Sequence, residues 1–176
     1  MRDTCDIVLV GRAMHMAIEA HADQKYGERP YYTHLLEVYE HVRATDPEDA
    51  ELAAAAWLHD AVEDTYLTAE VILNDLDSQR VADLVYAVSD GPGANRRERK
   101  ELPYTVIPTV PGALVLKMCD RLANIRSCIR TENEGLLSMY RKEHETFRAR
   151  LIRDRALTQD ERMLWRTICD ELGGRR

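Results

Sequence analysis

The apolar residues of this chain recur every three or four positions along almost its whole length. This is the period of an α-helix with one apolar face, whereas the strict alternation expected of a half-buried strand is rare. Ile7, Val10, Met14 and Ile18 form the first such stripe and predict a helix over about residues 3–23. The pattern therefore predicts an all-α fold.

Start and stop signals predict where further helices lie. Asp46-Pro47-Glu48 combines a capping side chain, a proline and an acid at the positive end of the helix dipole, so we expect a helix over 46–64. Thr68 and Asp77-Ser78 could each open another, and Gly91-Pro92-Gly93 ends one. Residues 27–30 read as a polar turn. The remaining predicted helices cover about 35–42, 115–129, 134–153 and 158–172, and 91–111 is expected to be irregular.

Length and charge narrow the classes of function. The chain has 176 residues, which suits one domain over 1–176, with 24 Lys and Arg against 31 Asp and Glu, a net charge of −7. An acidic chain is a poor non-specific ligand for nucleic acid or anionic membranes. No apolar run approaches the ~20 residues that cross a bilayer. Cys5, Cys119, Cys128 and Cys169 show no C-x-x-C spacing, so we expect reduced thiols and a cytoplasmic location.

Four ionisable residues gather at the end of the helix predicted over 46–64: His59, Asp60, Glu63 and Asp64. At roughly 100° per residue, they fall within an arc of about 140° on one helix face. Clustered carboxylates repel one another unless a cation or solvent compensates their charge. The pattern indicates a cation site, and the alternative is an exposed helix end with solvated acids.

Two other places in the chain offer further ligands for a cation. Lys117, Asp120 and Asn124 recur at i, i+3 and i+7 on a largely apolar helix, where a buried carboxylate needs a partner. His34 lies at the start of the second predicted helix. Nitrogen and oxygen ligands of this kind suit Mn²⁺, Fe²⁺ or Zn²⁺. The alternatives are a helix-start role for His34 and a partner for Asp120 among Arg121 and Arg126. The candidate metal ligands are His34, His59, Asp60 and Asp120.

Three blocks of sequence carry a family resemblance. They are 20–34, which ends in Pro-Tyr-Tyr-Thr-His, then 57–65, which contains His-Asp-x-x-Glu-Asp-Thr, and 117–124, which contains Asp-Arg-Leu-x-Asn. Together they resemble the HD-domain metal phosphohydrolases of the RelA/SpoT type, and most of all the small stand-alone alarmone hydrolases without a synthetase domain. The resemblance spans about 21–140 and implies a compact helical HD-domain bundle.

The resemblance also implies an activity and a site. It implies Mn²⁺, or another divalent metal, held by the four candidate ligands, with Glu63 and Asp64 orienting and deprotonating the attacking water. The implied reaction releases pyrophosphate from the 3′ position of guanosine tetra- or pentaphosphate. The positions that would hold the nucleotide are Lys25, Asn124, Ser127 and Tyr140. Ordinary surface polarity for Asn124 and Ser127, and packing for Tyr140, are the alternatives.

Some features depart from the family pattern or extend it. Leu35 replaces the proline that usually follows the first histidine, the segment 24–30 is one residue short, and the usual Arg-Lys pair facing guanine is represented by Lys25-Tyr26. Residues 95–100 form a basic cluster able to meet phosphates, or a solvated helix face. The alternative functions are therefore hydrolysis of another nucleotide, a catalytically silent nucleotide-binding module, and a helical adaptor with no site. The oligomeric state is left open.

Overall fold

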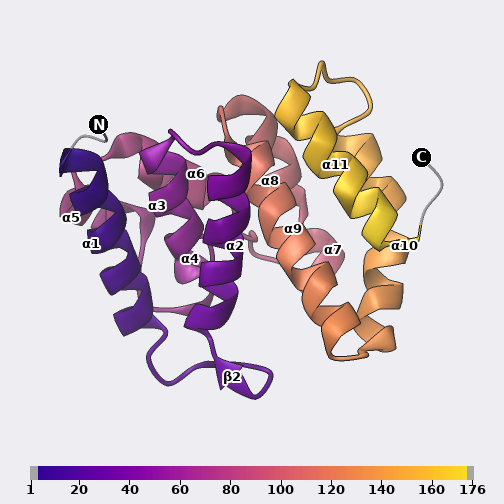
Figure 1. The fold of residues 1–176 in the computed structure, drawn as a ribbon, viewed down its shortest axis with the longest axis horizontal. Coiled ribbons are helices and arrows are strands. Elements are labelled where there is room, and N and C mark those ends of the chain that lie inside the picture. Colours follow the sequence, from indigo (N-terminus) through magenta and orange to yellow (C-terminus); the bar gives the residue numbers. More distant parts are fainter. Residues whose placement is uncertain (1–3, 174–176) are drawn as a thin grey trace.

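The chain folds into helices connected by short turns, with one small hairpin (Figure 1). The computed structural model describes residues 4–173. The elements are α1 (Thr4–Ala20), β1 (Lys25–Tyr26), β2 (Arg29–Pro30), α2 (Tyr32–Thr45), α3 (Ala50–Leu58), α4 (Ala61–Asp64), α5 (Ala69–Leu76), α6 (Gln79–Val88), α7 (Arg96–Arg99), α8 (Glu101–Val106), a 3₁₀ turn (Ile107–Thr109), α9 (Ala113–Arg130), α10 (Glu134–Leu151) and α11 (Gln159–Glu171). The prediction of an all-α fold is confirmed.

Helices α3 and α9 form the centre of this bundle. Helix α3 packs against α1, α2 and α6, and α9 packs against α2, α6, α10 and α11. The alanine run Ala53–Ala56 is fully buried, and its small side chains allow neighbouring helices to approach α3 closely. In Figure 1, α1 to α6 occupy the left half and α9 to α11 the right half. The start of α2, the end of α3 and the middle of α9, at Asp120, meet between the two halves.

Several helix boundaries follow the local signals in the sequence. The side chains of Thr68 and Ser78 cap α5 and α6 by accepting hydrogen bonds from backbone amides three residues later. Helix α9 begins directly after Gly112, and Thr158 with Glu161 forms a capping box at the start of α11. Reciprocal bonds of this kind satisfy amides that have no partner within the helix.

The prediction of one helix over 46–64 is wrong at both ends. Helix α3 begins at Ala50, and Asp49, not Asp46, accepts the capping bond from the Leu52 amide at 2.9 Å. The helix ends at Leu58, and a turn through 59–60 separates it from the short α4. The four ionisable groups therefore do not lie along one continuous helix face.

The prediction of an irregular segment over 91–111 is also wrong. This segment contains α7, α8 and the 3₁₀ turn, and α6 ends at Val88, before the Gly-Pro-Gly sequence. The Asn95 side chain caps α7 at the Glu98 amide. Gly93 packs so tightly that a Cβ there would lie 2.8 Å from the Arg99 amide nitrogen. The polar turn predicted over 27–30 is confirmed at residues 27–28, with Gly27 at φ +64°, whereas Arg29 and Pro30 form β2 of the hairpin.

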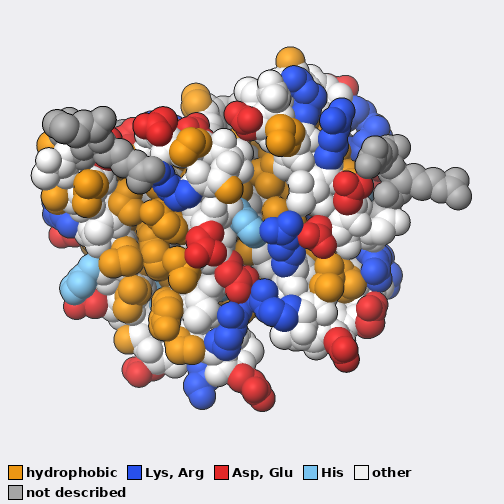
Figure 2. Space-filling model, in the orientation of Figure 1, with side chains coloured by type: hydrophobic (Ala, Val, Ile, Leu, Met, Phe, Trp, Pro, Cys, Tyr) orange, Lys and Arg blue, Asp and Glu red, His pale blue; other side chains and the backbone are white. Residues whose placement is uncertain are grey.

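The apolar stripe that indicated the first helix remains largely at the surface. Ile7, Met14 and Ile18 are 63%, 39% and 38% exposed, whereas Ala13 and Ala17 are the residues of α1 that are fully buried. Figure 2 shows hydrophobic side chains gathered on this face between α1 and α2. Helix α1 thus packs against α3 through alanine.

Within residues 4–173, none of the helices combines the length and apolar character needed to span a membrane.

Substitution of Asp49 and of Asp46 tests which of the two residues caps the start of α3. Asp49→Ala is expected to lower the free energy of unfolding by about 1–2 kcal/mol, because the cap is lost and Arg80 loses its carboxylate partner. Asp46→Ala is the matched control and should change stability by less than about 0.5 kcal/mol, because Asp46 is exposed. Urea unfolding of both variants measures the difference, and equal effects would contradict the assignment of the cap.

Candidate active site

A cavity of about 620 Å³ opens between the two halves of the bundle. Its wall includes His34 from α2, Asp60 from the α3–α4 turn, Glu63 from α4 and Asp120 from α9. Opposite them lie residues of α7 and α8, and Tyr140 of α10. The blocks that carried the sequence pattern, far apart in the chain, thus meet at one cavity.

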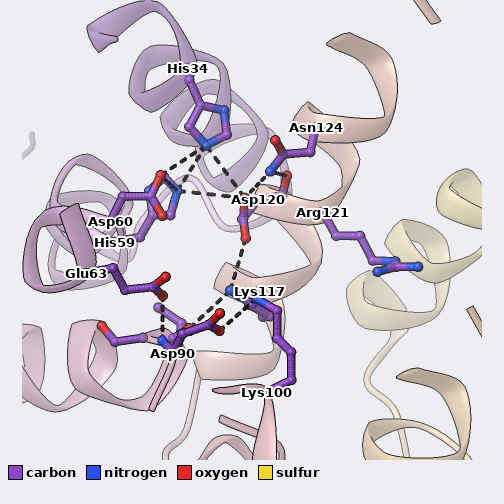
Figure 3. A network of polar contacts seen from close by, with 12 residues as sticks. His34, His59, Asp60, Glu63, Asp90, Lys100, Lys117, Asp120, Arg121 and Asn124 are labelled. Carbon is purple, nitrogen blue, oxygen red and sulfur yellow. Dashed lines mark hydrogen bonds and ion pairs between the residues drawn. The ribbon is translucent and has the colours of Figure 1, made fainter. Parts of the chain in front are cut away.

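The four candidate metal ligands converge at one end of this cavity (Figure 3). The Nε2 atoms of His34 and His59 lie 3.2 Å apart. The Asp60 Oδ2 atom lies 3.4 Å from the first and 3.1 Å from the second. The Asp120 Oδ1 atom lies 3.6 and 3.8 Å from the same nitrogens. Two imidazoles and two carboxylates from three separate parts of the chain therefore face a common point.

The donor set fits a divalent cation. The Nδ1 atom of His59 lies 2.9 Å from the Ala56 carbonyl oxygen, an arrangement that leaves Nε2 as the lone-pair donor toward the common point. His34 is 1% exposed, and among the described residues its Nδ1 has no hydrogen-bond partner. Two imidazole nitrogens and two carboxylate oxygens are ligands used by Mn²⁺, Fe²⁺ and Zn²⁺. His34, His59 and Asp120 are close enough together to share one ion, and Asp60 adjoins them.

The close contact between histidines and carboxylates at this end of the cavity shifts the pKa values of both. Burial alone would lower the pKa of His59, but the carboxylates of Asp60 and Asp120 raise it to about 9. Burial likewise opposes ionisation of Asp60, yet the two histidines hold its pKa well below the ordinary value. The protein thus favours positive charge at the common point, which a proton or a metal ion can supply.

Asp120 has partners other than those expected from the sequence. Lys117 Nζ lies 3.2 Å from Asp120 Oδ2 and donates to the Val88 carbonyl at 3.0 Å. Arg126 instead pairs with Glu171, and Arg121 donates to the Tyr140 carbonyl. In Figure 3 the Arg121 side chain points away from Asp120. The alternative to a metal-ligand role, in which Arg121 or Arg126 pairs with Asp120, is not what the structure shows, because both side chains extend toward the C-terminal helices.

Glu63 and Asp64 border the cavity next to the candidate metal ligands. The backbone amide of Asp90 donates to Glu63 Oε1 at 2.6 Å, which fixes one carboxylate oxygen. The surrounding walls desolvate this carboxylate and raise the pKa of Glu63, although Lys117 opposes the shift. A raised pKa moves a carboxylate toward the range in which a general base works near neutral pH.

Of the four residues predicted to hold the nucleotide, two line the cavity and two do not. Asn124 and Tyr140 line the cavity. Ser127 is 8% exposed and lies outside that lining, and Lys25 is exposed to solvent. Tyr26 lines the cavity beside His34, with 4.7 Å between the ring centroids.

The hydroxyl of Tyr26 makes Asn124 part of the metal end of the cavity. It donates to Asn124 Oδ1 at 2.7 Å, while Asn124 Nδ2 donates to the carboxylate and carbonyl oxygens of Asp120. Asn124 therefore links the hairpin to the candidate metal ligand Asp120. Its spacing from Asp120 did not indicate the contact with Tyr26.

Cationic side chains line a second part of the cavity, here called its cationic end, which adjoins the first at Asp90, and most have an acidic partner. Arg96 binds Glu143 at 2.6 Å, and Lys100 binds Asp90 at 2.7 Å. Arg121, 6% exposed, lies over the rings of Tyr140 and Phe147 at 5.1 and 4.8 Å. The cavity thus combines an acidic, histidine-containing end with a cationic end. Polar cavity residues to which the sequence analysis assigned no role include Tyr31, Asp90, Tyr104 and Glu143.

Comparisons with known proteins place the chain in a family. The family model for the HD domain matches residues 13–103. The guanosine-3′,5′-bis(diphosphate) 3′-pyrophosphohydrolase MESH1 of Xenopus tropicalis is 33% identical over 138 residues, which cover 74% of this chain and 75% of that protein. Human MESH1 is 38% identical over 88 residues, covering 49% of each chain.

A solved structure also matches the fold. It is that of a metazoan ortholog of SpoT that hydrolyses ppGpp, and the match covers 94% of this chain and 96% of that one. The TM-score is 0.70 and the sequence identity is 22%, so this likeness supports the fold. The chain therefore belongs to the HD-domain family and, within it, is a relative of the MESH1 pyrophosphohydrolases.

Proposed function

We propose that the chain is a metal-dependent hydrolase that removes the 3′-pyrophosphate from guanosine tetra- or pentaphosphate. The observation that carries this proposal is the convergence of the four proposed metal ligands beside Glu63 and Asp64, in a cavity that also has a cationic end. The MESH1 relatives named for this reaction are similar over most of the chain. We also propose that residues 1–176 act as one domain and that the protein works in the cytoplasm.

The proposed cofactor is Mn²⁺, held by His34, His59, Asp60 and Asp120. When bound, a divalent ion supplies a Lewis acid that favours deprotonation of water and offsets phosphoryl charge. The donor set supports this choice, since mixed imidazole and carboxylate ligands suit Mn²⁺, and it also suits Fe²⁺ or Zn²⁺.

The chain's own residues carry the remaining steps. Glu63 and Asp64 orient the attacking water and accept its proton, with the raised pKa of Glu63 favouring this role near neutral pH. The cationic end, with Arg96, Arg99 and Lys100, compensates the phosphate charges of the substrate. These cations already hold acidic partners, so the substrate must exchange for or share those contacts.

Asn124 and Tyr140 are the proposed nucleotide contacts with the best support, because both line the cavity. Lys25 and Ser127 stay predictions from the family pattern, since both lie outside that lining. A second candidate function is hydrolysis of another nucleotide. It is favoured by Tyr26, a neutral ring at the cavity wall where a cation was expected.

Purified protein is expected to release pyrophosphate and GDP from ppGpp when Mn²⁺ is present and to stop when EDTA removes the metal. The physical reason is that Glu63 and Asp64 alone cannot offset the phosphoryl charge. Ion-exchange chromatography of the products measures both species. The control is re-addition of Mn²⁺ after EDTA, which should restore the rate. Absence of release by metal-loaded protein would reject this substrate and favour another nucleotide.

A further inference from the structure

Tyr31 belongs to the Pro-Tyr-Tyr-Thr-His block, but neither the sequence analysis nor the proposed mechanism gives it a role. It lies between the hairpin and α2, three residues before the metal ligand His34. Its hydroxyl lies 2.7 Å from Asp60 Oδ2 and 3.0 Å from Asp64 Oδ2. One phenol thus touches both a metal ligand and a carboxylate assigned to water activation.

The chemistry of this contact makes Tyr31 a donor. A phenol carries its proton at neutral pH and an ionised carboxylate can only accept, so the Tyr31 hydroxyl donates to Asp60 and Asp64. Its single proton is shared between two carboxylate oxygens. Two carboxylates that contact the same hydroxyl repel each other, and a shared donor reduces that repulsion.

The surrounding residues fix where this hydroxyl points. The Tyr31 ring stacks on the buried ring of His21, with 4.5 Å between centroids and 1° between planes. His21 Nδ1 contacts Gln24 Oε1 at 2.8 Å, and Gln24 Nε2 donates to the backbone carbonyl of Asp64 at 2.6 Å. The segment 21–24 therefore holds both the ring of Tyr31 and the backbone of Asp64.

The two water-activating carboxylates are held by different means. Glu63 is fixed by the backbone amide of Asp90, whereas Asp64 is fixed by the Tyr31 side chain. We infer that Tyr31 is a positioning residue that holds the Asp64 carboxylate beside the metal ligand Asp60. This inference rests on the proposed function for its kinetic consequence, but its structural part, the bond to Asp60, does not.

Tyr31→Phe tests the inference, because it removes the hydroxyl and keeps the ring that stacks on His21. Tyr32→Phe is the matched control, since Tyr32 is the next residue, undergoes the same chemical change and is 43% exposed. Two quantities are measured for both variants. The first is the affinity for Mn²⁺ without substrate, by competition with a chelating dye. The second is kcat and KM for ppGpp at saturating Mn²⁺.

For Tyr31→Phe we expect Mn²⁺ affinity to fall about 10-fold or more and kcat to fall about 10–100-fold even at saturating metal, with KM changed less than about twofold. Tyr32→Phe should match the wild type in all three. Wild-type kcat at saturating Mn²⁺ would overturn the role toward Asp64, and unchanged Mn²⁺ affinity would overturn the role toward Asp60. If the wild type does not cleave ppGpp, the proposed function fails, while the affinity measurement still decides the contact with Asp60. Circular dichroism melting confirms that each variant is folded.

Discussion

Asp120→Ala is expected to abolish metal binding and to lower ppGpp hydrolysis by more than about 100-fold, the upper end of what losing an outer hydrogen-bond partner of a metal ligand costs. Its Oδ1 atom is the one contribution of α9 to the common point faced by His34 and His59. Without it, the ligands that remain all come from residues 34–60. Metal content after dialysis against Mn²⁺, and pyrophosphate release, measure the two effects.

The loss of Asp120 also leaves Lys117 as a buried ammonium without its carboxylate partner, which destabilises the fold. The double variant Asp120→Ala with Lys117→Met removes that unpaired charge and should recover thermal stability without recovering metal. Asp83→Ala, an exposed acid on α6, controls for the loss of a carboxylate elsewhere. Stoichiometric metal in either Asp120 variant would show that Asp120 is not a ligand.

The parts of the fold that the sequence predicted well depend on local chemistry. Thr68, Ser78 and Thr158 each cap a helix by accepting a hydrogen bond from the amide three residues later. The capping residue and its partner are therefore both visible in a short stretch of sequence. Asp46 and Asp49 present the opposite case, since both are acids next to the same helix start. Asp49 caps it because it also binds Arg80, 31 residues away, and spacing does not reveal such a contact.

Short elements were missed because tertiary contacts support them. The segment 91–111 is rich in Gly and Pro, yet α7 and α8 form there because Gly91 donates to the Arg99 carbonyl and Lys100 pairs with Asp90. The β1–β2 hairpin has two residues per strand, and a change of register by one residue reverses which side chain faces inward. This explains why Tyr26, and not Lys25, lines the cavity.

The side chains that meet at the cavity were predicted from the sequence more fully than the helix boundaries around them. His34, His59, Asp60 and Asp120 were selected by residue type and motif, and the structure brings all four together. The helical-arc argument selected His59 to Asp64 from a continuous helix that does not exist. The turn at 59–60 is what directs these side chains to the cavity. Tyr31 and Asp90 were missed because a hydroxyl or an amide that orients a carboxylate leaves no pattern in spacing.

The double variant Glu63→Gln with Asp64→Asn is expected to keep bound metal and to lose hydrolysis by about 10²–10⁴-fold, the usual contribution of a positioned acid or base. Both changes preserve shape and remove the groups that accept the proton. The single variant Glu63→Gln should also change the pH profile. Because desolvation raises the pKa of Glu63, wild-type kcat should fall with decreasing pH earlier than an ordinary glutamate would dictate, and Glu63→Gln should lose this dependence.

The control for this double variant is an equal change of charge away from the cavity. Glu70→Gln with Asp77→Asn removes the same two charges from exposed positions and should retain wild-type turnover. An enzyme whose water is activated by Glu63 and Asp64 must separate these two double variants by kcat while both hold metal. Equal turnover in the two would remove the water-activating role. A wild type that binds metal and ppGpp without cleaving it would instead identify a silent binding module, because every ligand would be present and only the chemical step missing.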